Sequence, residues 1–119
     1  MMTPREVAEC AVRALDEKKG KDIAVLETHD LTVLADYFIL CTATSTTHIK
    51  TLADAVGKAL SEKGEAPLRT EGYRAGGWVL VDLGCVVVHV FLADVRKFYN
   101  LEHLWSDAPR MDVSGLVTE

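Results

Sequence analysis

The stretch WVLVD at residues 78–82, followed by Leu83 and Gly84 and then by CVVVHVFL at residues 85–92, decides the expected fold. Both runs are rich in β-branched residues, which favour strands, and glycine is readily accepted in tight hairpin turns. The sequence therefore predicts an antiparallel hairpin here, and the rest of the sheet is expected to be built outward from it.

The N-terminal part of the chain predicts two helices and further strands. Thr3, Pro4 and Glu6 form a helix start with a capping box, and the amphipathic pattern continues until Gly20. A second amphipathic helix is expected after the hydroxyl-rich residues 43–47, ending at residues 63–64. The strand candidates are residues 22–28, residues 37–42, whose continuous apolar run indicates a central strand, and residues 68–71 within a loop-like stretch.

Beyond the hairpin, Asp94 is expected to cap a short helix through Tyr99, and Asn100 to cap a second helical turn through Trp105. Residues 108–119 have no sustained period and are expected to form a mobile tail. No linker, repeat or low-complexity tract divides the chain. The prediction is an α/β fold with one domain at residues 1–107, in which a mixed sheet is flanked by helices.

The chain has 119 residues, 49% hydrophobic and 26% charged, which is typical of a globular domain with one core. Its three cysteines lack disulfide or metal-binding spacing and favour a reducing cytoplasm. Without a signal peptide or an apolar run of about 18 residues, neither export nor membrane insertion is expected. The net charge of −5 disfavours direct nucleic-acid binding and suits a basic protein partner.

Catalytic motifs are missing from the sequence. None of the four histidines lies in a nucleophile signature or has the spacing of a zinc site. His89 in the predicted hairpin and His48 near the start of the second helix are interpreted as structural residues. Glycine-rich phosphate loops and an Asp-x-Asp pair for Mg²⁺ are also absent. The sequence therefore predicts a binding protein without cofactor or metal, rather than an enzyme.

Large amphipathic residues gather in the second half of the chain. They are Tyr73, Trp78, Tyr99 and Trp105, interleaved with Arg96, Glu102 and His103. Tryptophan, tyrosine and arginine dominate many protein interfaces because they bury a large area and keep a polar group. For each aromatic residue, packing in the core is an alternative of similar weight. Phe91 and Phe98 are expected in the core, because both are purely apolar residues of periodic elements.

A set of short motifs follows in order along residues 4–107. They are Leu34–Phe38, Thr42 with Ser45 and His48, Glu71-Gly72, Trp78–Asp82, Val88–Phe91, and Arg96 through Tyr99–Trp105. Each motif is weak alone, but their order and spacing together are highly specific. In this arrangement the chain closely resembles the bacterial ribosomal silencing factors, also called the Iojap-related family.

The resemblance implies a nucleotidyltransferase-like fold without a working catalytic site. It also implies binding to the fourteenth protein of the large ribosomal subunit (uL14), at the face that meets the small subunit, so that subunit joining is blocked when nutrients are scarce. Family members often form homodimers when free and bind the ribosome as monomers. The residues that we assign to partner binding are Trp78, Asp82, Arg96, Tyr99, Leu101, Glu102 and Trp105.

Two hypotheses of other classes stay open at this point. One is a nucleotidyltransferase-like enzyme that uses Mg²⁺ and a nucleoside triphosphate, against which the missing Asp-x-Asp after residues 42–45 argues. The other is a dimerising scaffold without a ribosomal role, which only the resemblance excludes. Co-migration with the large ribosomal subunit would separate the first hypothesis from both.

Overall fold

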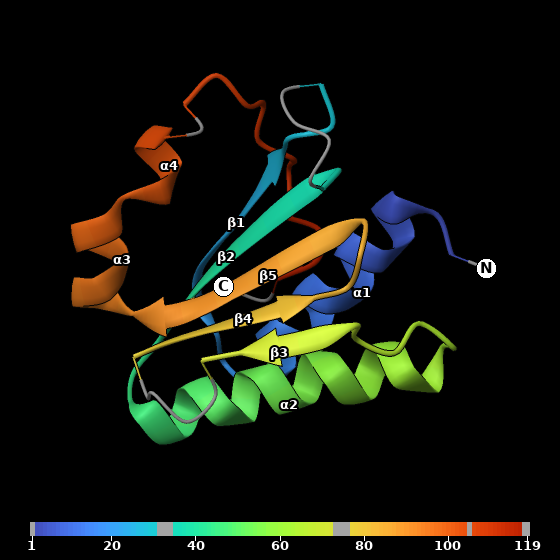
Figure 1. The fold of residues 1–119 in the computed structure, drawn as a ribbon, viewed down its shortest axis with the longest axis horizontal. Helices are drawn as coiled ribbons and strands as arrows, with labels where there is room; N and C mark the ends of the chain where they lie inside the picture. Colours follow the sequence, from blue (N-terminus) through green and yellow to red (C-terminus); the bar gives the residue numbers. More distant parts are fainter. Residues whose placement is uncertain (1, 31–34, 73–76, 105, 118–119) are drawn as a thin grey trace.

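The computed structural model describes residues 2–30, 35–72, 77–104 and 106–117. Its elements are α1 (Pro4–Glu17), β1 (Lys21–Glu27), β2 (Tyr37–Ala43), α2 (Thr46–Glu62), β3 (Arg69–Glu71), β4 (Trp78–Asp82), β5 (Val86–Leu92), α3 (Ala93–Tyr99) and α4 (Leu101–Leu104). The strands form one sheet in the order β1-β2-β5-β4-β3 (Figure 1). The β2/β5 pair is parallel and the others are antiparallel, which confirms the predicted mixed sheet.

Both long helices begin as predicted. The Thr3 hydroxyl accepts from the Glu6 amide at 3.2 Å, and the Glu6 carboxylate accepts from the Thr3 amide at 2.8 Å, which completes the capping box. Ser45 caps α2 by accepting from the His48 amide at 3.1 Å. The first helix ends at Glu17, before the expected Gly20, because the Gly20 amide closes a final turn onto the Leu15 carbonyl at 2.8 Å.

The predicted hairpin is confirmed, with its turn one residue later than expected. The Leu83 amide donates to the Val86 carbonyl at 2.9 Å, so the two turn residues are Gly84 and Cys85. Gly84 has a φ of 90°, a conformation that glycine adopts easily. The shift has a packing reason, because alternate residues starting at Val86 point into the buried core.

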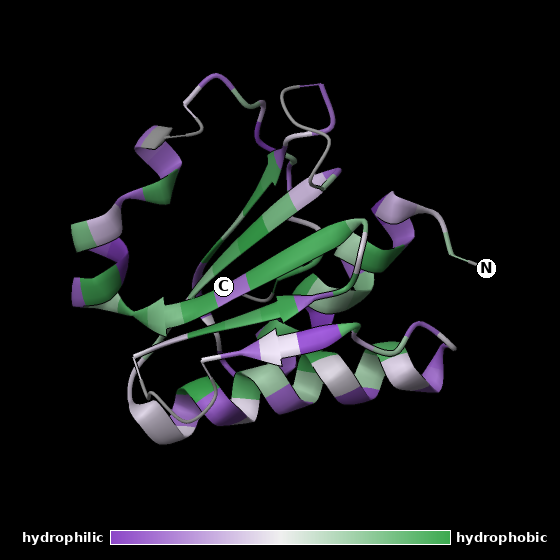
Figure 2. Cartoon of the chain, in the orientation of Figure 1, coloured by the Kyte–Doolittle hydropathy of each residue, from purple (hydrophilic) through white to green (hydrophobic). Residues whose placement is uncertain are grey.

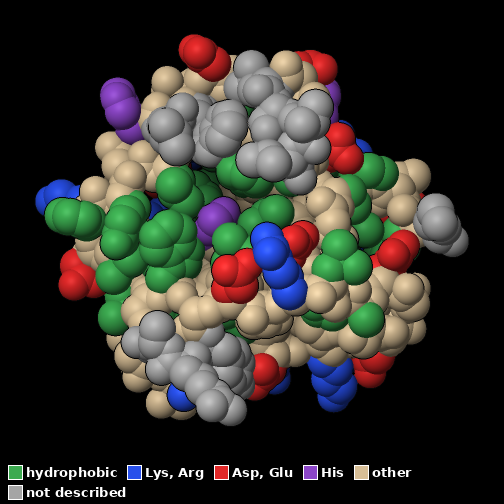
Figure 3. Space-filling view, viewed as in Figure 1, with side chains coloured by type: hydrophobic (Ala, Val, Ile, Leu, Met, Phe, Trp, Pro, Cys, Tyr) green, Lys and Arg blue, Asp and Glu red, His purple; other side chains and the backbone are tan. Residues whose placement is uncertain are grey.

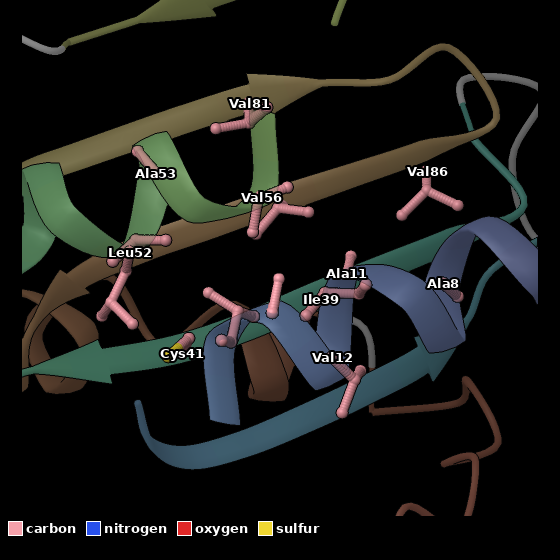
Figure 4. Close-up of a cluster of buried hydrophobic side chains, with 14 of the residues drawn as sticks. Ala8, Ala11, Val12, Ile39, Cys41, Leu52, Ala53, Val56, Val81 and Val86 are labelled. Carbon is pink, nitrogen blue, oxygen red and sulfur yellow. The ribbon is translucent and has the colours of Figure 1, made fainter. Parts of the chain in front are cut away.

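One face of the sheet is covered by α1 and α2. Most of the core lies between these two helices and the sheet (Figure 4). Every residue of β2 is buried, as its apolar run predicted, although β5 is the middle strand of the sheet. Figure 2 shows hydrophobic residues concentrated on β2, β4 and β5. The buried residues that α1 and α2 contribute are Val7, Ala8, Ala11, Val12, Ala14, Leu15, Ile49, Leu52, Ala53, Val56 and Leu60.

The opposite face carries a smaller core. Its buried residues are Ala24, Leu26, Ala35, Phe38, Leu40, Phe91 and Ala108, and the half-buried Trp78, Val87, Val95 and Leu101 pack around them. The short helices α3 and α4 lie at one end of this face (Figure 1). This uneven cover leaves half-buried side chains of β4 facing outward, which positions the candidate site.

The start of the first C-terminal helix differs from the prediction. The position before α3 is Leu92, which has no side-chain cap, and Asp94 lies inside the first turn, with its carboxylate accepting from the Val95 amide at 3.0 Å. The prediction that Asp94 caps the helix is therefore wrong. The reason is that β5 continues to Leu92, which pairs with Ala43, so the helix begins directly at the end of the strand.

Asn100 joins the two short helices. It ends α3 in a left-handed conformation with a φ of 49°, and its carbonyl accepts from the His103 amide at 3.0 Å at the start of α4. The described part of α4 ends at Leu104, and Trp105 lies outside the described residues.

The segment after residue 107 follows the outer edge of β1. The Glu27 amide donates to the Pro109 carbonyl at 2.7 Å, the Met111 amide donates to the Val25 carbonyl at 2.9 Å, and Arg110 pairs with Leu26. Residues 108–111 thus have the hydrogen bonds of an edge strand, and Ala108 and Met111 are buried. The mobility expected for residues 108–119 stays a prediction, although residues 109–111 make these hydrogen bonds to β1.

Candidate partner-binding site

Trp78 and Tyr99 come together on the less covered face of the sheet. Trp78 begins β4 and Tyr99 ends α3, and their ring centroids lie 4.8 Å apart. The Trp78 indole also packs 5.6 Å from the Phe91 ring, and its N–H donates to Nδ1 of His89 at 3.1 Å. The indole is therefore held between a buried strand and an exposed helix.

The end of α3 presents aromatic side chains to solvent. Phe98 is 80% exposed and Tyr99 is 54% exposed, and no residue of α3, which the structure describes throughout, is buried. We refer to residues 93–104 as the aromatic arm. Figure 3 shows hydrophobic side chains gathered over α3 and the adjoining strands. Large exposed apolar groups in one patch are a mark of a partner-binding surface.

An open hollow of about 510 Å³ lies beside the arm. It is lined by Glu71, Gly72, Gly77, Trp78, Leu80, Val95 and Tyr99. Gly72 has a φ of 79°, and a Cβ at this position would collide with the carbonyl oxygen of Trp78. Only glycine therefore allows the chain to pass this close to β4 at the lining of the hollow.

His89 is a neutral residue that binds the indole of Trp78, a residue of the hollow's lining. Burial lowers the pKa of His89 to about 4, because a charged imidazole loses its hydration in this position. Its Nδ1 accepts the hydrogen bond from Trp78, so the proton of the neutral ring is on Nε2. This geometry confirms the structural interpretation of His89.

A cluster of charged side chains lies on the outer strands of the same face. Nε of Arg69 is 3.2 Å from Oδ2 of Asp82 and 3.0 Å from Oε2 of Glu71. The second carboxylate oxygen of Asp82 accepts from the Gly84 amide at 2.9 Å. Asp82 therefore stabilises the hairpin turn and the β3–β4 pairing.

A second ionic network fixes the base of the aromatic arm. The side chain of Arg96 is only 11% exposed, and its Nε donates to Oε1 of Glu102 at 3.0 Å. Its Nη1 donates to the Asp22 carbonyl at 2.6 Å and to the Thr42 hydroxyl at 2.9 Å. Oε2 of Glu102 is 2.8 Å from Nη2 of Arg110. The hydrogen bond from Arg96 holds the pKa of the Glu102 carboxyl below its ordinary value.

Comparison with known proteins gives the family. The family described as "ribosomal silencing factor during starvation" matches residues 1–119. The chain belongs to this family. It is 39% identical over 117 residues to the ribosomal silencing factor of Halalkalibacterium halodurans, covering 98% of this chain and all of that one. The Bacillus subtilis factor is also 39% identical, over 94% of this chain and 95% of its own length.

A solved structure agrees with the fold of this silencing factor. The crystal structure of a Chromobacterium violaceum protein matches with a TM-score of 0.86 and 44% identity, covering 88% of each chain. The predicted resemblance and the α/β fold are therefore confirmed.

Membership of the family also answers the question of catalysis. Ribosomal silencing factors are regulators that bind ribosomes and catalyse no reaction, in agreement with the prediction from sequence. Among the residues that the structure describes, no three His, Cys, Asp or Glu side chains lie close enough to hold a metal ion. Within the same residues, no helix is long and apolar enough to cross a membrane.

The residues that we assigned to partner binding fall into separate groups in this silencing factor. Trp78 and Tyr99 contact each other beside the hollow, and Leu101 of the arm packs half-buried against the smaller core. Arg96 and Glu102 bind each other at the base of the arm.

One of the remaining assignments, Asp82, lies away from the aromatic pair. Asp82 is at the far end of β4, paired with Arg69. Trp105 lies outside the described residues, as does Tyr73.

The residues assigned from the sequence did not include four others that lie at the candidate site: Phe98, Leu80, Val95 and Arg110. The expectation that Phe98 lies in the core is wrong, whereas Phe91 is fully buried as predicted. Phe98 and Tyr99 are neighbours in a helix and point about 100° apart, so both cannot face one narrow contact with the sheet. That adjacency was the available signal. Nothing in the sequence indicated the pairing of Arg110 with Glu102.

Proposed function

We propose that this ribosomal silencing factor binds the large ribosomal subunit through its fourteenth protein (uL14), on the face that the small subunit must approach. Occupation of that face prevents subunit joining and represses translation when nutrients are scarce. The aromatic arm carries the proposal: Phe98 and Tyr99 are exposed beside an open hollow on the less covered face of the sheet. Such residues supply much of the binding energy in protein interfaces.

The charge of the chain favours a protein partner over ribosomal RNA. With a net charge of −5, the chain is repelled at long range by phosphates and attracted by basic ribosomal proteins. The hollow itself carries the carboxylate of Glu71 at its rim. A basic protein surface with an apolar projection is therefore the partner that fits this face.

The proposed roles of the individual residues follow from their contacts. Trp78 and Tyr99 contact the partner directly, together with Phe98 and Val95 of the arm. The other assigned residues act at the edge of the contact or support it; they are Asp82, Arg96, Leu101 and Glu102. Trp105 stays in the proposal because of its amphipathic side chain and its place directly after α4.

We also propose that the free protein forms a homodimer and acts in the cytoplasm as a monomer on the ribosome. Apolar side chains that are exposed in the monomer would be removed from water in a dimer. Light scattering over a range of protein concentrations tests this, with a mass that rises with concentration as the expected result. A constant monomer mass would contradict the dimer without affecting the ribosomal proposal.

Sedimentation of ribosomal subunits tests the main proposal. The purified protein is expected to migrate with isolated large subunits and to reduce the fraction of joined ribosomes when small subunits are added. Co-migration without any effect on joining would reject occlusion as the mechanism. Absence from the large-subunit fraction would reject the proposal as a whole.

Substitutions locate the contact. Phe98→Ala and Tyr99→Ala are each expected to weaken large-subunit binding by about 2 kcal/mol, the usual loss at an interface hot spot. Leu68→Ala is a matched control, because Leu68 is 73% exposed but lies beside the far end of β4. Equal binding by all three variants would remove the aromatic arm from the interface.

A further inference from the structure

The aromatic arm has few apolar anchors of its own. No residue of the fully described α3 is buried, and Leu101 in α4 is only half-buried. Hydrophobic burial stabilises an element in proportion to the apolar area removed from water, so α3 receives little stability from this source. Val95 packs half-buried against the smaller core and the Tyr99 ring contacts Trp78, so polar contacts at the base supply the rest of the positioning of α3.

Arg96 supplies the first of these contacts. Its guanidinium reaches back from α3 to the ends of two strands, donating to the Asp22 carbonyl and the Thr42 hydroxyl, and it lies over the Phe91 ring at 5.9 Å. The same guanidinium binds Glu102 of α4 through Nε. Arg96 therefore joins α3 and α4 to the sheet.

Arg110 supplies a contact from outside the arm. Its Nη2 is 2.8 Å from Oε2 of Glu102, the oxygen that Arg96 does not use. The backbone of Arg110 pairs with Leu26, and the flanking residues Pro109 and Met111 hydrogen-bond to β1. A continuous path of contacts thus runs from the edge of β1 through Arg110 and Glu102 to the arm.

We propose that Arg110 is a positioning residue, which holds the aromatic arm in its binding orientation through Glu102. The C-terminal segment, which pairs with β1, thereby supports the binding surface. This inference rests on the proposed function, since it concerns the same surface. Loss of Arg110 frees one oxygen of Glu102, and the arm then samples more orientations. The partner must order the arm when it binds, which lowers affinity.

The first experiment compares Arg110→Ala with Arg5→Ala in the full chain. Arg5 is a matched control, because it is 61% exposed against 59% for Arg110 and pairs with Glu9, on the helix-covered side of the molecule. Both variants lose one positive charge. Arg110→Ala is expected to weaken large-subunit binding by about threefold to fivefold, in the range of a partly exposed ion pair, and Arg110→Lys to restore part of it. Equal binding by Arg110→Ala and Arg5→Ala would overturn the proposal.

A double-variant cycle separates positioning from direct contact. If Arg110 acts through Glu102, the effects of Arg110→Ala and Glu102→Gln on binding are not additive. The double variant then binds no more weakly than the single variant with the lower affinity. Additive losses would mean that Arg110 touches the ribosome itself, which would overturn the positioning role.

Hydrogen exchange in the free protein keeps the two proposals distinguishable. Amides of residues 97–104 are expected to exchange faster in Arg110→Ala than in Arg5→Ala, with unchanged global stability in urea. If the wild-type protein fails to bind large subunits, the proposed function fails, but this exchange contrast still supports the coupling. Equal exchange of these amides in the two variants would overturn it.

Discussion

The two faces of the sheet have opposite relations to their helices. On one face, α1 and α2 contribute eleven fully or nearly fully buried residues to a dense core. On the other, α3 contributes none, and its aromatic side chains point to solvent. The first arrangement stabilises the fold, whereas the second leaves apolar area available to a partner. The comparison indicates that the helix-covered face supplies most of the stability, and our proposal assigns binding to the other face.

The largest expected effect lies on the helix-covered face. Leu52 of α2 is fully buried, and Leu52→Ala is expected to lower the free energy of unfolding by about 2 to 5 kcal/mol through lost burial and a cavity. Urea denaturation measures it. The same change at the exposed Leu68 is the control and should stay within about 0.5 kcal/mol. Similar losses of stability for both variants would contradict the view that the helix-covered face supplies most of the stability.

A pH-dependent effect is expected from the other face. Burial lowers the pKa of His89 from 6.5 to about 4, so between these values the unfolded chain binds a proton that the folded chain does not. The contribution is fully present above about pH 6.5 and is lost as the pH falls to about 4, a change of about 3 kcal/mol.

Urea denaturation at several pH values in this interval tests the effect. His89→Leu should remove this part of the pH dependence, so the stability of the variant should fall less on acidification than that of the wild type. Parallel curves for the two proteins would show that His89 is protonated equally in both states.

A smaller effect on stability is expected at the arm. Because Phe98 is 80% exposed, Phe98→Ala should change the free energy of unfolding by no more than about 0.5 kcal/mol while it weakens binding. The ratio of the two effects sharpens the contrast between the faces. A loss of stability as large as that of Leu52→Ala would mean that the ring packs inside the protein.

No effect at all is expected from nucleotides. Titration with ATP, GTP, CTP or UTP in the presence of Mg²⁺ should give no saturable heat, because the sequence lacks an Asp-x-Asp pair to hold the metal. Micromolar affinity, about −8 kcal/mol, for any of them would assign a ligand site to this fold and contradict a purely docking role.

Local sequence signals predicted most of the secondary structure. The capping box at Thr3, the hydroxyl cap of α2 and the β4–β5 hairpin act between residues close in the chain. The two caps were predicted correctly, and the hairpin was predicted with its turn one residue too early. The errors occurred where strand pairing sets the boundary. The continuation of β5 to Leu92 removed the predicted cap at Asp94, since pairing with β2 outweighs a local capping preference.

The candidate site was predictable only in part. Trp78 and Tyr99 were recognisable as candidate interface residues from their chemistry, and the structure brings them together. The exposure of Phe98 was missed because an apolar residue in a helix is usually buried, and here the short α3 has little sheet to cover. The carboxylate of Glu102, which was assigned to partner binding, contacts two arginines of its own chain in the structure.

The fold class, the family and the absence of catalytic motifs follow from residue types, periodicity and the order of motifs along the chain. Which face stays open and how the arm is held depend on contacts between distant parts of the chain. Arg96 meets Asp22 and Thr42, which lie 74 and 54 residues away in the sequence. Arg110 reaches Glu102 from a segment that pairs with Leu26 of β1. Contacts of this kind depend on the path of the sheet, which no local pattern specifies.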